Sequence, residues 1–232
     1  MVETFDKEIL NNLELFILPG KYLKVDEYTS IYNKTYSHWK KIWVEILDSK
    51  QNTKSDNFMR QDFLCSLMLN GEVVGLITCY FFNPNLIAVN DHSYLKPFPS
   101  DQYSAPDNKS YSMSIEYLSV SPNLRKSYMP ISLGNVLLGI SMKVFEESGA
   151  YSVLGTARNK LHVEKMCYEF GFKPIGKIEK FGLDCTLIVN LIDSLKKHPD
   201  FLTRKTIDSI WSKKVDLVRQ ININSNHGRI TA

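Results

Sequence analysis

Residues 119–139, SVSPNLRKSYMPISLGNVLLG, place two cations and a loop between a strand-like segment and a helix-like segment. Arg125 and Lys126 follow the apolar end of the first segment, and Gly134 lies where a periodic apolar run begins. A helix N-terminus leaves about four backbone N–H groups unpaired and carries partial positive charge, so cations beside it favour an anion such as phosphate. Strand–helix junctions without a ligand carry the same residue types, so both interpretations stay open.

The elements that would position this junction alternate between strands and helices. Apolar spacing predicts helices at 25–47, 133–147, 159–170 and 203–219, and strands at 63–69, 73–82, 113–120, 150–157, 173–180 and 183–191. Asn70-Gly71 predicts a tight hairpin turn, because this pair tolerates positive φ angles. The fold class is therefore α/β (α+β), with a mixed, mostly antiparallel twisted sheet flanked by helices and a central β-α-β step over 113–157.

Residues 83–110 are rich in Pro, Asn, Asp and Ser, and predict a long loop of the kind that forms lids or insertions. We expect one domain over residues 1–195, followed by a basic amphipathic helix and tail over 196–232. Residues 196–219 carry seven Lys or Arg against three Asp. This segment either contacts an anionic partner or presents a solvated face.

Composition excludes several functional classes. The chain has 232 residues, of which 44% are hydrophobic, enough for a sizeable core, and its net charge of +3 does not indicate nucleic-acid binding. No apolar run approaches the roughly 18 residues of a membrane span, and the N-terminus lacks an apolar signal core, so we predict a cytoplasmic protein. Four cysteines without CxxC spacing predict buried free thiols, and the histidine spacing predicts no metal site.

The junction resembles motif A of the GNAT superfamily of acyl-CoA-dependent N-acyltransferases. The matching residues are Leu118, Val120, Pro122, Arg125, Gly134 and the pair Leu137-Leu138. Gly71 to Gly75 resembles the hairpin of that family, and Asn159 with MCYEFGFKPIG at 166–176 resembles its next helical segment. The resemblance covers residues 25–191 and implies a GNAT-like fold with acetyl-CoA or another acyl-CoA as co-substrate, and no metal.

The resemblance also implies a mechanism in which an amine attacks the thioester directly. Backbone at Leu118, Ser119 and Val120 would bind the pantetheine arm and the thioester carbonyl. The pyrophosphate would lie against the loop and helix start, at Arg125, Lys126, Ser127, Gly134 and Asn135. Asn159 would contact the pantetheine arm, or would cap the following helix.

Glu116 is the candidate base, because a carboxylate in this strand could take the proton of an incoming ammonium. Strand alternation places Glu116, Leu118 and Val120 on one face; the alternative is an edge or salt-bridge glutamate. The tyrosine that would assist thiolate departure in the family falls on Cys167, and Tyr168 lies one step away, about 100° around a helix. We name Tyr168 as the candidate acid.

The chain departs from the family pattern in the motif A loop. That loop is four residues longer than usual, and Ser127 to Ser132 replaces its compact glycine turn. The segment GFKPIGKIEKFGLDCTLIVNLID at 171–193 resembles long-chain N-acyl amino acid synthases and autoinducer synthases. The resemblance to that subgroup implies acyl carrier protein or a long acyl-CoA as donor.

Three functions remain as hypotheses. The first is an N-acyltransferase, in its simplest form an N-acetyltransferase, acting on a small-molecule or peptide amine. The second is a long-chain N-acyl amino acid synthase or an acyl-homoserine-lactone-synthase-like enzyme that uses acyl carrier protein. The third is a non-catalytic acyl-CoA-binding regulatory module. The C-terminal helix could also form a homodimer contact.

Overall fold

The computed structural model describes residues 12–47, 53–106, 110–125 and 131–218. Over these residues the chain forms one eight-stranded sheet with the order β6-β7-β5-β4-β3-β2-β1-β8. The strands are β1 (Leu13–Leu18), β2 (Phe63–Leu69), β3 (Glu72–Phe82), β4 (Ser112–Val120), β5 (Ser152–Arg158), β6 (Lys173–Lys180), β7 (Leu183–Leu191) and β8 (Val215–Asp216).

Only two of the strand pairs in this described sheet are parallel. β4 pairs with β5 across the crossover that contains α6 (Leu133–Ser148), and β8 pairs with β1 at the sheet edge. The other neighbours are antiparallel. The predicted class, a mixed and mostly antiparallel sheet around a β-α-β step, is confirmed.

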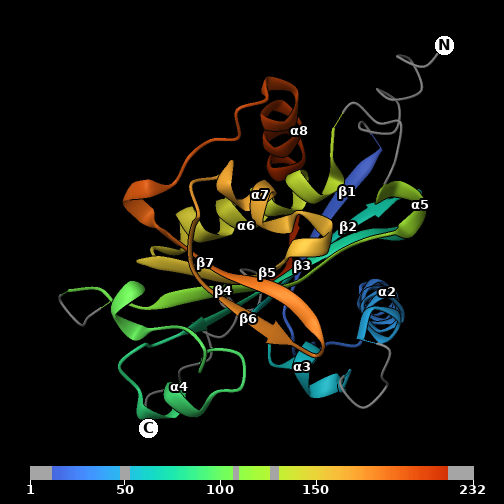
Figure 1. Cartoon of the computed structure of the whole chain (residues 1–232). Helices are drawn as coiled ribbons and strands as arrows, with labels where there is room; N and C mark the ends of the chain where they lie inside the picture. Colours follow the sequence, from blue (N-terminus) through green and yellow to red (C-terminus); the bar gives the residue numbers. More distant parts are fainter. Residues whose placement is uncertain (1–11, 48–52, 107–109, 126–130, 219–232) are drawn as a thin grey trace, which may run out of the picture.

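Helices cover both faces of the sheet (Figure 1). One face packs against α6, α7 (Val163–Tyr168) and α8 (Phe201–Ser212), and the other packs against α2 (Thr29–Leu47) and α3 (Ser55–Met59). The remaining short elements are α4 (Ile87–Asp91), α5 (Pro122–Arg125) and the 3₁₀ turns η1 (Ser100–Gln102), η2 (Asn159–Leu161) and η3 (Ile192–Ser194).

The long segment after β3 folds back over the sheet. Val89, Leu95, Phe98 and Tyr103 form a cluster with side chains of β5 and β7, and all four are buried. This segment therefore extends the cover that α2 gives to the same face, and brings loop residues over the middle of the sheet.

Local turn chemistry agrees with the sequence predictions. Asn70 (φ 52°) and Gly71 (φ 77°) are both left-handed, as the hairpin between β2 and β3 requires. Gly149 ends α6 with a φ of 78°, a conformation that glycine adopts without a Cβ clash. All four cysteines are free and buried, as expected.

Three expectations about the elements are wrong. The helix expected at 159–170 is broken at His162, whose φ of 53° is left-handed, so a 3₁₀ turn precedes a short α7. The last helix ends at Ser212 instead of Arg219. Its continuation forms β8, because the outer edge of β1 offers unpaired backbone groups to Val215 and Asp216. β1 itself was not predicted.

The proposed division of the chain at residue 195 stays a prediction, although α8 packs on α6 and β1. Among the helices of the described ranges, none is both long and apolar enough to cross a bilayer. Lys126, Ser127 and the C-terminal tail lie outside the described residues.

Candidate functional site

β4 and β5 separate halfway along their length. Their register runs from Ser112 opposite Ser152 to Ile115 opposite Gly155, and goes no further. A cavity of about 630 Å³ begins where the pairing ends. Its walls extend from Gly134 in the first turn of α6 to the C-terminal half of α2. The opening thus passes between the two central strands and reaches both helical layers.

A bulge in β4 shapes this cavity. Glu116 lies opposite Thr78, but Ser119 lies opposite Leu76, so β4 holds one residue more than β3 across this interval. Tyr117 absorbs the extra length with a φ of 54°. A left-handed tyrosine is uncommon and persists only when its surroundings hold it there.

Two tryptophans of α2 hold the bulged residue. The ring of Tyr117 makes edge contacts with Trp39 at a centroid distance of 5.5 Å and with Trp43 at 5.1 Å. These two tryptophans of α2 therefore pack against the sheet and fix the backbone of β4 at the point where it separates from β5.

The bulge contradicts the prediction that Glu116, Leu118 and Val120 share one face. Leu118 and Val120 pack with the α6-side core, whereas Glu116 is in register with a residue that faces α2. Ser119 also faces α2, where its hydroxyl lies 3.4 Å from His38 Nε2. The extra residue reverses which side chains of β4 face α2 beyond Tyr117, and no short-range sequence pattern in the strand predicts this bulge.

Glu116 is the only carboxylate among the described residues that line the cavity. It is 4% exposed, forms an ion pair with Arg60 of the α3 region, and accepts a hydrogen bond from Ser114 Oγ at 3.1 Å. Burial raises the pKa of Glu116 above its usual value, while Arg60 and Lys180 oppose that shift. A carboxylate with a raised pKa is a stronger base than an exposed one.

Arg60 is held in turn by aromatic and imidazole groups. Its guanidinium lies 5.5 Å from the ring centre of Tyr80, and its Nη1 lies 3.4 Å from His92 Nε2. Burial lowers the pKa of Arg60, but Glu116 and Tyr117 more than offset it, so the net shift is upward. The cation and the carboxylate therefore stabilise each other's charged forms.

Tyr94, from the long segment after β3, occupies the apex of the split. Its hydroxyl donates to the Ile115 carbonyl at 3.0 Å and accepts from the Thr156 N–H at 3.0 Å. It therefore replaces the next inter-strand hydrogen bond. The ammonium of Lys180, at the end of β6, lies 4.2 Å from the centre of the Tyr94 ring.

The motif A junction lines the opposite part of the cavity. Arg125 donates from Nε to the Val120 carbonyl at 2.8 Å, and Ser132 caps α6 by accepting from the Asn135 N–H at 3.4 Å. A Cβ on Gly134 would meet the end of the Met166 side chain, so α6 and α7 pack closely at this glycine.

Two asparagines named from the sequence do not line the cavity. Asn159 donates to Asp184 and accepts from Thr186, each at 2.8 Å, so both ends of its amide are engaged away from the opening. The amide nitrogen of Asn135 lies 2.9 Å from Nε2 of the buried His198. Their roles in ligand binding stay predictions.

Tyr168 also lies outside the cavity, and its side chain is 38% exposed. Cys167, its neighbour on α7, lines the cavity and is 1% exposed. Cys167, where the family resemblance places its tyrosine, is thus the residue that faces the cavity, and Tyr168 lies one helical step away from it. Burial raises the pKa of the Cys167 thiol, so the thiol is neutral at ordinary pH.

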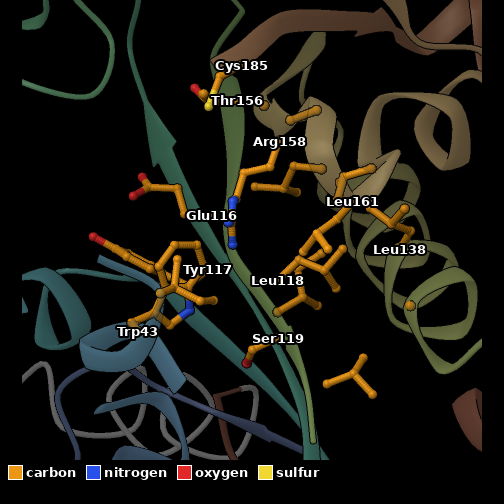
Figure 2. A pocket seen from close by; sticks show the side chains of 18 of the residues that line it. Trp43, Glu116, Tyr117, Leu118, Ser119, Leu138, Thr156, Arg158, Leu161 and Cys185 are labelled. Atoms are coloured by element: carbon orange, nitrogen blue, oxygen red, sulfur yellow. The ribbon is translucent and has the colours of Figure 1, made fainter. Parts of the chain in front are cut away.

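Of the predicted site residues, Glu116, Leu118, Ser119, Val120, Arg125 and Gly134 all line one cavity. Four further lining residues were not proposed as site residues from the sequence: Arg60, Tyr94, Arg158 and Lys180. Figure 2 shows Arg158 extending from β5 toward the middle of the cavity. Arg60 and Tyr94 come from segments without motifs, so only the folded chain brings them here.

Comparisons with known proteins identify the architecture. No family model and no curated protein matches the sequence. Among solved structures, a CoA-dependent acyl-homoserine lactone synthase, BjaI, determined with SAM and isopentyl-CoA, has a TM-score of 0.58. It is 12% identical, and the alignment covers 91% of this chain and 99% of BjaI. The chain has the GNAT fold.

Further GNAT-fold structures agree with that assignment. An acyl-CoA N-acyltransferase from Pseudomonas aeruginosa has a TM-score of 0.50 at 10% identity, with 77% of this chain and 99% of that one aligned. TofI, in a ternary complex with an inhibitor and MTA, has a TM-score of 0.51 at 14% identity, covering 84% and 96%. These structural alignments establish the fold that the sequence resemblance implied.

Proposed function

We propose that this chain is an acyltransferase that moves an acyl group from a thioester to an amine. The observation that carries the proposal is the split between β4 and β5, which opens at Ile115 and Gly155 beside a buried carboxylate. The GNAT fold supports it, since BjaI and the Pseudomonas enzyme are named as acyl-CoA-dependent enzymes with this architecture.

The donor would lie between the separated strands. Beyond Ile115, β4 has no β5 partner, so the backbone groups on that side of residues 117–120 face the cavity. N–H groups fixed in this way stabilise the negative charge that develops on a thioester carbonyl under attack. The start of α6 and Arg125 would receive the phosphates of the donor.

The acceptor would approach from the α2 side, where Glu116 lies. Glu116 removes a proton from the ammonium, the amine nitrogen bonds to the carbonyl carbon, and the carbon–sulfur bond breaks. The nitrogen then loses a second proton, the thiolate takes up that proton or one from solvent, and an amide and a free thiol leave. General base catalysis of this kind contributes about 10²- to 10⁴-fold.

The test measures thiol release and amide formation with purified protein. Acetyl-CoA, a branched short-chain acyl-CoA, a long-chain acyl-CoA and acylated carrier protein are each paired with a panel of amines. We expect turnover with at least one donor and a loss of about 10²-fold or more in Glu116→Gln. Glu179→Gln, on the exposed side of β6, is the matched control and retains activity.

Either of two results contradicts the proposal. One is that no donor raises the unfolding temperature or releases thiol with any amine. The other is stabilisation by acyl-CoA without turnover in the presence of every amine, which identifies a binding module. Activity with carrier protein but not with CoA keeps the acyl-transfer chemistry and assigns the donor.

A further inference from the structure

The cavity has a surplus of positive charge. Its described lining holds four cationic side chains, Arg60, Arg125, Arg158 and Lys180, against the single carboxylate of Glu116. Arg60 is neutralised by Glu116, and Arg125 donates to a backbone carbonyl. Arg125 keeps its charge and is assigned above to the phosphates of the donor, which leaves Arg158 and Lys180 as the two lining cations without an assigned counter-ion.

Neither of these two cations has a carboxylate or carbonyl acceptor within the described ranges. The Nε atom of Arg158 is buried and has no hydrogen-bond partner there. Burial lowers the pKa of Arg158, but a guanidinium does not lose its proton at ordinary pH, so the charge stays. Lys180 contacts ring faces of Tyr94 and Phe181. Both side chains are half-buried, so a cation without a partner there is less well solvated than at the surface, and a ligand anion would offset that loss.

Arg158 and Lys180 approach the cavity from the same wall. Arg158 lies directly opposite Cys185 in the β5–β7 pair, and Lys180 ends β6 beside the same strand. Both cations lower the pKa of the Cys185 thiol, against a larger upward effect of burial, so both act on this one point. Arg158 and Lys180 therefore both lie near Cys185, at the same part of the cavity wall.

The opposite wall carries the negative charge. Glu116 projects from β4, across the split from the wall of Arg158 and Cys185 (Figure 2). Burial lowers the pKa of Lys180, and the carboxylate of Glu116 partly offsets this by attracting the ammonium across the cavity. A ligand that spans the chamber meets the carboxylate of Glu116, together with its partner Arg60, at one end and two cations without a carboxylate partner at the other. That pattern matches a zwitterion.

We propose that the acyl acceptor is a free amino acid, whose ammonium faces Glu116 and whose carboxylate is bound by Arg158 and Lys180. This inference rests on the proposed function and names the acceptor class for the same site. A guanidinium binds a carboxylate through paired N–H donors, and an ammonium adds a point charge. Charge-assisted hydrogen bonds of this kind correspond to about 10- to 100-fold in affinity.

The experiment compares acceptors that differ only in the carboxylate. Leucine is paired with 3-methylbutylamine, phenylalanine with phenethylamine, and tryptophan with tryptamine, each with the best donor. We expect kcat/KM to favour the acid by roughly tenfold or more in at least one pair. Arg158→Met and Lys180→Met each lower the ratio of kcat/KM for the acid to kcat/KM for the amine, and a cooperative unfolding transition like that of the intact protein shows that the variants fold. Lys177→Met, exposed on β6, keeps the preference.

Three results would overturn the inference. Equal use of acid and amine in every pair is the first, and an unchanged preference in both variants is the second. The third is a preference for succinyl-CoA over butanoyl-CoA that both variants lose, because the cations would then bind a carboxylate of the donor.

Failure of acyl transfer itself is distinguishable from failure of this inference. If no thioester is consumed, the same pairs are tested for a rise in unfolding temperature without donor. Stabilisation by an amino acid but not by its amine, lost in Arg158→Met and Lys180→Met, supports the carboxylate site without any turnover. No stabilisation by any amino acid overturns it.

Discussion

Replacing Arg60 with Met removes the partner of a buried carboxylate and keeps an apolar stem over Tyr80. Without the guanidinium, Glu116 must either stay charged in a buried site or take up a proton. A buried charge that loses its partner costs about 3–5 kcal/mol. Protonation of Glu116 limits this cost. Keeping the carboxyl neutral in the folded protein costs about 1.4 kcal/mol for each pH unit by which the solution lies above the pKa of the group in the unfolded chain.

The loss of stability therefore depends on pH. The unfolded pKa of Glu is about 4.3, so the limit is roughly 3.7 kcal/mol at pH 7 and about 1 kcal/mol at pH 5. The pKa of Glu116 is already raised by burial in the intact protein. The folded state of Arg60→Met binds a proton that the unfolded state has released, so its stability falls as pH rises above about 4.3 toward the new folded pKa.

Urea unfolding at pH 5, 6 and 7, followed by tryptophan fluorescence, measures this dependence. The double variant Arg60→Met/Glu116→Gln removes the titrating group, and we expect it to be more stable than Arg60→Met at pH 7. A loss in Arg60→Met that is the same at all three pH values would refute the reasoning. So would a double variant that is no more stable than the single one.

Three further predictions concern positions around the cavity. Tyr94→Phe removes the hydroxyl that bridges β4 and β5; we expect a loss of about 1–3 kcal/mol in unfolding free energy and lower kcat/KM, and an unaltered kcat/KM contradicts its positioning role. Burial lowers the pKa of His38 to about 4. Between about pH 6.5 and 4 the unfolded chain therefore binds a proton that the folded protein does not, and the intact protein should lose stability as the pH falls through this range. Urea unfolding of His38→Gln over the same range should show a smaller loss. Gly139→Ala places a Cβ against the side chain of Ile207 and should lower the unfolding free energy by about 1–3 kcal/mol. Thermal unfolding should show partial recovery in Gly139→Ala/Ile207→Val. An unchanged stability in Gly139→Ala would mean that Ile207 or α8 moves freely to make room.

Short-range patterns predicted the elements whose geometry depends on neighbouring residues. The hairpin at Asn70-Gly71 follows from two residues that accept positive φ, and the end of α6 follows from Gly149. The GNAT fold was implied by the resemblance of the segment around Leu118 and Arg125 to motif A of that family. These features need no knowledge of what packs against them.

The features that were missed depend on contacts between distant segments. The bulge at Tyr117 is held by Trp39 and Trp43, which lie more than seventy residues earlier in the chain. Strand alternation assumes a regular pleat, so it placed Glu116 on the wrong face. Tyr94 acquires its place only when its loop folds over the sheet.

The parallel pairing of β8 with β1 joins the last strand of the described chain to the first. Within the described residues, the outer edge of β1 has its partner only in β8, which follows α8. An unpaired edge is a template for pairing with other chains. Contacts between segments so far apart also form slowly. β8 therefore covers part of an edge that would otherwise be open to pairing with another chain, and this cover depends on one of the contacts that form slowly in folding.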